Sequence, residues 1–226
     1  MKENFRDSEY WARAAESRER YRLVRDSAWR MFLKHRVRSL PVDVFRICRR
    51  EGICVMSYRE AAECGLLDVL GGVADGKDGF ALVIRGKKLV FYDDACPIGR
   101  QRFTVAHELG HFVLGDVGAE PTVRNCEPSE DDDETEKLAN MFAARLLSPA
   151  CVLWGLRVRS AEEIAKICGL SRAAAEWRFR RLCELYERER DWFARYGRSC
   201  FLLSPLEAKV YSRFGRFIKT RNRRSD

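Results

Sequence analysis

Residues 102–115 have the sequence RFTVAHELGHFVLG, which places His107, Glu108 and His111 in an H-E-x-x-H pattern. The flanking residues are apolar and include no proline, so the stretch predicts a helix over about 99–115. On a helix, residues four apart share a face, and both histidines can therefore bind one metal ion. Glu108 is offset by about 100° and can stand beside the metal as the general base for a water molecule. The pattern predicts a zinc hydrolase site.

The third ligand of such a site does not follow from the pattern itself. A catalytic zinc takes three protein ligands and keeps a fourth position for water. In the extended form of the motif a histidine follows six residues after the second one, but that position is Val117. The one other histidine, His35, lies in a predicted basic helix. Acidic residues and one thiol remain as alternatives: Asp116, Glu120, Cys126, residues 130–134 and Glu136.

Glu136 is the ligand that we favour, with Glu134 as the second choice. Glu136 lies on an otherwise apolar helical stripe with Asn140, Ala143 and Leu147. A carboxylate on such a stripe needs a partner when it is buried, and a metal ion would provide one. One turn further on, Asn140 could orient a ligand histidine through the other nitrogen of its ring.

The composition is that of a globular protein with a charged surface: 46% of the residues are hydrophobic and 34% are charged. No run approaches the roughly 20 apolar residues of a membrane span, and residues 1–7 lack the apolar core of a secretory signal. We therefore expect a cytoplasmic protein without membrane contact. The nine cysteines form no C-x-x-C pair, so we expect free thiols. We place four of them in the core: Cys48, Cys54, Cys168 and Cys183.

The first half of the chain predicts two helices followed by a small sheet. Apolar periodicity indicates a helix over 8–36 and a second one that follows Pro41 and ends at Gly52. Residues 53–58 predict a buried strand, and residues 59–70 a short helix. Two strand-like runs, 80–84 and 88–92, flank Arg85-Gly86-Lys87 and predict a β-hairpin. An edge strand of this sheet could pair with an extended peptide substrate.

The second half predicts helices alone. Ser129 is the expected N-cap of a helix that ends at Leu147, and further helices are expected over 160–168, 171–186 and 205–218, before a disordered tail. The fold class is therefore α+β, mostly helical with a small antiparallel β-sheet and a C-terminal, helix-turn-helix-like region. We divide the chain into a basic N-terminal helix (1–38), a metal-binding domain (39–150) and a C-terminal helical region with a basic tail (151–226).

The basic ends of the chain allow a different function. The net charge is +8, and residues 189–226 carry 10 Lys or Arg against 4 Asp or Glu. Such ends could make weak contact with nucleic acid. The helix-turn-helix outline over 160–187 carries Arg172, Arg178, Arg180 and Arg181. The alternative is therefore a regulator that binds DNA or sequesters a repressor through this region, with zinc in a structural or regulatory role.

Two motifs in this order resemble a known family. The first is RFTVAHELGH over 102–111, and the second is EKLANMFAARLLSP over 136–149. Together they resemble the ImmA/IrrE family of metallopeptidases, which is similar to thermolysin-like zincins. The resemblance implies a zincin-like core in which zinc is bound by His107, His111 and Glu136, with Glu108 as the general base. It also implies a protein substrate, expected to be a helix-turn-helix repressor whose cleavage lifts repression.

Overall fold

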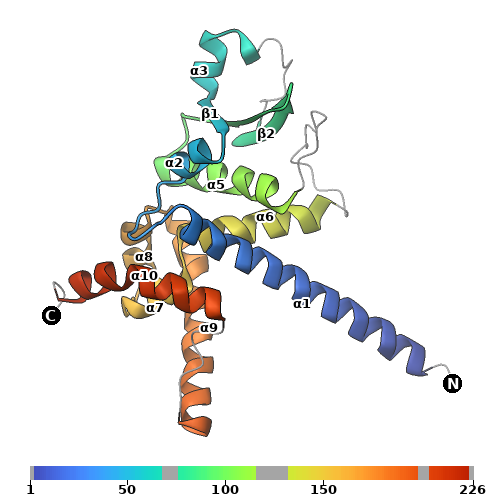
Figure 1. Cartoon of the computed structure of the whole chain (residues 1–226), viewed down its shortest axis with the longest axis vertical. Coiled ribbons are helices and arrows are strands. Elements are labelled where there is room, and N and C mark those ends of the chain that lie inside the picture. Colours follow the sequence, from blue (N-terminus) through green and yellow to red (C-terminus); the bar gives the residue numbers. More distant parts are fainter. Residues whose placement is uncertain (1–2, 68–75, 116–131, 198–203, 224–226) are drawn as a thin grey trace.

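The fold is seen in a computed structural model, which describes residues 3–67, 76–115, 132–197 and 204–223. Helices dominate these residues, and three strands form one small sheet, so the predicted α+β class is confirmed. The sheet lies on α5, and α5 lies on α6 (Figure 1). The helices of the described residues are α1 (Glu3–Lys34), α2 (Val44–Arg50), α3 (Tyr58–Glu63), α5 (Ile98–Leu114), α6 (Asp132–Leu147), α7 (Ala150–Gly155), α8 (Ala161–Cys168), α9 (Arg172–Tyr196) and α10 (Pro205–Asn222).

The sheet has the strand order β1-β3-β2, with β1 (Ile53–Ser57), β2 (Gly79–Ile84) and β3 (Lys87–Tyr92). The predicted hairpin is present: β2 and β3 are antiparallel, and both turn residues have positive φ, 49° at Arg85 and 76° at Gly86. β1 is parallel to β3, so the sheet is mixed, and the expectation of an antiparallel sheet was wrong. A parallel pair needs a long crossover, which α3 and β2 provide between these two strands.

Both ends of α5 are set by local sequence. Pro97 precedes its first residue, and Gly115 ends it in the left-handed conformation with φ 89°. The Gly115 N–H donates to the carbonyl of His111, which satisfies one of the last carbonyls of the helix. The helix carrying the H-E-x-x-H pattern therefore spans almost the predicted range.

Gly110 sets the distance between α5 and α6. A Cβ atom at this position would lie 3.1 Å from the side chain of Phe142 and 3.3 Å from the backbone of Ala139. We therefore expect Gly110→Ala to lower the free energy of unfolding by about 1–3 kcal/mol, through overpacking. Gly215→Ala in α10 is the control, because no heavy atom lies within 4 Å of a Cβ there. Urea denaturation of both variants measures the difference, and equal midpoints would contradict the tight contact.

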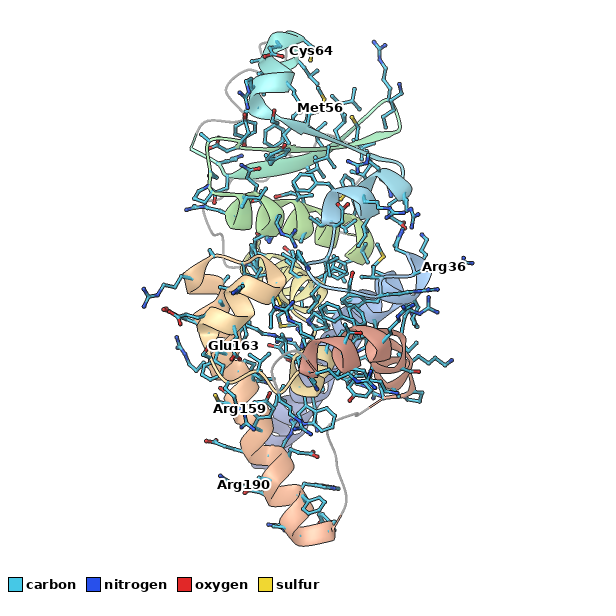
Figure 2. The ribbon with its side chains drawn as sticks, turned by 90° about the vertical axis from the view of Figure 1, so that its left-hand side faces the viewer. Arg36, Met56, Cys64, Arg159, Glu163 and Arg190 are labelled. Carbon is cyan, nitrogen blue, oxygen red and sulfur yellow. The ribbon has the colours of Figure 1, made fainter. Side chains whose placement is uncertain are left out.

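One large hydrophobic core joins all three predicted segments. Its buried residues run from Val24 in α1 to Ile218 in α10 and include Leu109 of α5 and Leu146 of α6. A smaller cluster of Ala61, Phe80, Leu82 and Phe91 lies between α3 and the sheet. Figure 2 shows this end of the molecule, labelled by Met56 and Cys64, opposite the projecting end of α9 labelled by Arg190. This core includes residues on both sides of positions 38 and 150, and the division of the chain at these positions stays a prediction.

Several boundaries differ from those predicted. α2 begins at Val44, because Asp43 is its N-cap and accepts a hydrogen bond from the Arg46 N–H. α9 continues ten residues past the expected end, α7 was not predicted, and α10 extends to Asn222, into the tail expected to be disordered. Cys54 is exposed and Cys183 is half-buried, unlike the core positions expected of them. The expected cap Ser129 and the thiol Cys126 lie outside the described residues.

Among the residues that the structure describes, one helical stretch has the length and hydropathy of a membrane span. This stretch is residues 134–155, and 61% of its apolar 18-residue window is buried inside the protein. The stretch covers α6 and α7, whose residues Phe142, Leu146 and Leu153 are completely buried in the core. Its apolar character is therefore explained by packing between helices.

Candidate metal centre

Three side chains converge where α5 and α6 face each other. His107 and His111 come from α5, and Glu136 comes from α6. His107 Nε2 lies 3.0 Å from Oε2 of Glu136, and His111 Nε2 lies 3.2 Å from Oε1. The two Nε2 atoms are 3.0 Å apart. The structure thus brings together all three residues that we proposed as metal ligands.

The donor atoms fit a tetrahedral metal ion. Ligand atoms about 2.0–2.2 Å from such an ion lie roughly 3.3–3.5 Å from one another, close to the separations of 3.0–3.2 Å between these three side chains. Two imidazoles and one carboxylate are also the ligand set of a catalytic centre with an open fourth position. The Glu136 side chain is 39% exposed, whereas that of His111 is 4% exposed. Solvent therefore reaches the three donor side chains from the Glu136 side.

Asn140 contacts the ring of His107 at Nδ1, the nitrogen that does not face Glu136. Its Oδ1 lies 3.0 Å from His107 Nδ1. An amide oxygen only accepts, so this contact places a proton on Nδ1 of His107, and Nε2 is the ring nitrogen that faces Glu136 and His111. Asn140 is one helical turn after Glu136, so the same face of α6 supplies a donor atom and orients a second one.

We expect Asn140→Ala to weaken metal binding about 10–100-fold, because a partner of this kind fixes the tautomer and the direction of a ligand ring. Competition for the metal with a fluorescent chelator measures the change. Asn140→Asp retains an acceptor oxygen and should bind metal within a few fold of the wild type. If Asn140→Ala bound metal as tightly as the wild type, the ring of His107 would be held by packing alone.

Glu108 is buried beside the three donors. Its residue exposure is 8%, and burial raises the pKa of its carboxyl, while the charges of His107, His111 and Lys77 act in the opposite direction. A carboxylate with a raised pKa accepts a proton more readily near neutral pH, which suits a general base. For Glu136 the direction is reversed, because hydrogen bonds from His107 and His111 lower its pKa.

Lys77 was not identified from the sequence. It precedes β2 by two residues, and its charge lowers the pKa of Glu108. Lys77 lies 31 residues before Glu108, and no periodicity relates the two positions. Only the packing of the sheet on α5 brings this cation near the motif.

The second-choice ligand, Glu134, points elsewhere. Its Oε2 pairs with Arg20 of α1 at 2.8 Å, and its side chain is 54% exposed. His35 is also occupied away from the centre, because its Nε2 lies 2.5 Å from Glu51 Oε1. Of the remaining alternatives, Asp116, Glu120, Cys126 and residues 130–131 lie outside the described residues.

The helix-turn-helix outline is present as α8, Gly169 and α9, with Gly169 in the left-handed conformation at φ 63°. Arg178 of α9, one of the arginines expected to face DNA, is only 6% exposed. Its Nε and Nη2 both donate to the carbonyl of Ser148, at 2.8 and 2.5 Å. Arg178 therefore joins α9 to the C-terminal end of α6, whereas Arg172, Arg180 and Arg181 are exposed.

Comparison with known proteins agrees with this centre. A family model described as the IrrE N-terminal-like domain, Peptidase_M78, matches residues 72–180. The matched range contains α5 and α6 with all three donor residues, and it ends within α9. No curated protein matches the chain. This match supports the assignment of residues 72–180 to a metallopeptidase domain of the ImmA/IrrE (M78) family.

Proposed function

We propose that this protein is a cytoplasmic, zinc-dependent endopeptidase that cleaves a partner transcriptional repressor. The observation that carries the proposal is the convergence of His107, His111 and Glu136, with a buried glutamate beside them, in a domain of a metallopeptidase family. Two imidazoles and a carboxylate are the donor set that zinc takes in thermolysin-like enzymes.

The residues divide the chemistry among them. A bound zinc would supply the polarisation of a water molecule and of the scissile carbonyl. Glu108 would accept a proton from the attacking water at its carboxylate and deliver it to the leaving amine. Asn140 would hold the His107 ring in the tautomer that leaves Nε2 free to bind.

The sheet offers a way to hold a peptide. β2 is an edge strand in the order β1-β3-β2, and its first residue, Gly79, lies against Thr104 of α5, three residues before His107. A Cβ atom at Gly79 would lie 2.3 Å from the Thr104 side chain, so glycine permits this close approach. An extended substrate could pair with β2 through backbone hydrogen bonds.

A repressor is the substrate implied by the family resemblance, and co-expression tests it. The protein is produced together with small helix-turn-helix repressors encoded near its gene, and the repressors are examined by mass spectrometry. The expected result is one repressor cut at a single bond, with expression of a reporter restored. An intact repressor with a derepressed reporter would instead support sequestration, which is the alternative function. Weak nucleic-acid contact through the basic ends remains a secondary proposal.

A further inference from the structure

Two adjoining cavities lie along α6. The first has a volume of about 370 Å³ and includes Asn140, the residue that contacts His107, in its wall. The second has a volume of about 820 Å³. The two cavities share wall residues from α1, α6 and α9, among them Tyr21, Met141 and Trp177. They therefore form one continuous groove, which at one end reaches Asn140 beside the ligand histidine His107.

The first cavity is lined mainly by apolar and aromatic groups. Phe103 comes from α5, one turn before His107, and Met141 comes from α6. Leu170 and Trp177 close it from the turn before α9 and from α9 itself. A volume of about 370 Å³ accommodates a large apolar side chain, and an apolar wall favours its removal from water.

The second cavity is strongly basic. Seven arginines and two glutamates line it. The arginines come from three helices, and the charges of Arg25 from α1 and Arg181 from α9 both act on Arg145 from α6. Arg145 is half-buried and donates to the Met141 carbonyl, and the negative charge of Glu207 in the same wall offsets part of its own charge. Burial, together with the repulsion from Arg181 and Arg25, lowers the pKa of Arg145 to about 10.

Arginines gathered in this way favour an anionic occupant. Like charges that converge from three helices repel one another, and a bound carboxylate would relieve that repulsion. Arginine also holds carboxylates through two parallel hydrogen bonds. Arg25 and Arg181 are paired with acids on their own helices, the half-buried Asp26 and the exposed Glu184.

We infer that the groove selects substrates with an apolar side chain near the cleaved bond and acidic side chains about four residues away. Glu136 and Arg145 are nine residues apart on α6, a distance of about 14 Å along the helix axis. An extended peptide covers that distance in about four residues. The inference rests on the proposed peptidase function, because it assigns the occupant of the groove as the substrate of the metal centre.

Peptide binding tests the inference without cleavage. The zinc-loaded Glu108→Gln protein is titrated into two fluorescein-labelled peptides and followed by fluorescence anisotropy. Both peptides have a central leucine, and one carries Asp triplets four residues to either side where the other carries Asn. We expect the acidic peptide to bind at least about tenfold more tightly, as is typical of charge-assisted hydrogen bonds. In Arg145→Gln/Arg181→Gln the preference should fall below about threefold.

Controls separate the groove from general charge effects. Arg172→Gln removes an arginine of the same helix, paired with Glu176 outside the cavity, and should keep the full preference. If circular dichroism shows that the Arg145→Gln variant is unfolded, Arg25→Gln/Arg181→Gln replaces it. Equal binding of both peptides, or a preference that survives these changes, would overturn the inference. So would tripolyphosphate binding more tightly than the peptide through the same arginines, because the cavity would then be a site for small phosphates.

The outcomes also separate this inference from the proposed function. Wild-type protein is incubated with the same two peptides, and cleavage is measured. A preference for the acidic peptide without cleavage of any peptide or repressor would contradict the peptidase function and leave the anion-binding groove. Cleavage that depends on Glu108 and shows no preference for the acidic peptide would support the peptidase function and overturn the inferred substrate preference.

Discussion

Glu108→Gln is expected to lower the rate of substrate cleavage by about 10²–10⁴-fold while the zinc content stays that of the wild type. The amide has nearly the shape of the carboxylate but cannot accept the proton of the attacking water. Glu108 is buried, and the donors that surround the metal position are His107, His111 and Glu136. The substitution therefore removes the base and leaves the ligand set complete.

The measurement combines a cleavage assay on the identified repressor with zinc analysis of the purified protein. Glu134→Gln is the matched control, because the same chemical change is made at an exposed glutamate that pairs with Arg20. We expect the control to cleave at the wild-type rate. If Glu108→Gln retained the wild-type rate, another group would have to act as the base, and Glu108 would have no catalytic role.

Glu136→Ala is expected to weaken zinc binding by more than about 100-fold. The loss of a ligand should cost more affinity than the loss of a residue that hydrogen-bonds to a ligand, which typically costs about 10–100-fold. Both carboxylate oxygens of Glu136 face the imidazoles, at 3.0 and 3.2 Å. With alanine, two imidazoles remain as protein ligands among the described residues. Cleavage should fall together with metal content.

Glu134→Ala tests the assignment of this ligand, because Glu134 is two residues away and was the second choice. Its carboxylate pairs with Arg20 of α1, so its loss should leave metal affinity within a few fold of the wild type. Chelator competition and elemental analysis give both values. The opposite order, with zinc lost from Glu134→Ala and retained by Glu136→Ala, would move the third ligand to Glu134.

Local sequence predicted the parts of the centre that depend on neighbours along the chain. The i, i+4 spacing of His107 and His111 requires only a helix, and Gly115 ends that helix in the left-handed conformation that glycine readily adopts. The Arg85-Gly86 turn likewise sets the hairpin through its positive φ angles. These features follow from backbone preferences within a few residues, so one sequence is enough to find them.

Long-range packing decided the rest. Glu134 and Glu136 are both acids of the first turns of α6, and the structure directs the first to Arg20 and the second to the histidines. Arg178 was expected to face DNA, but it is buried where α9 packs on the end of α6 and donates to the Ser148 carbonyl. The sequence by itself therefore determined the helix with the two histidines and the glutamate. Only the tertiary structure decided which distant side chains meet them, because those contacts depend on how separate helices pack.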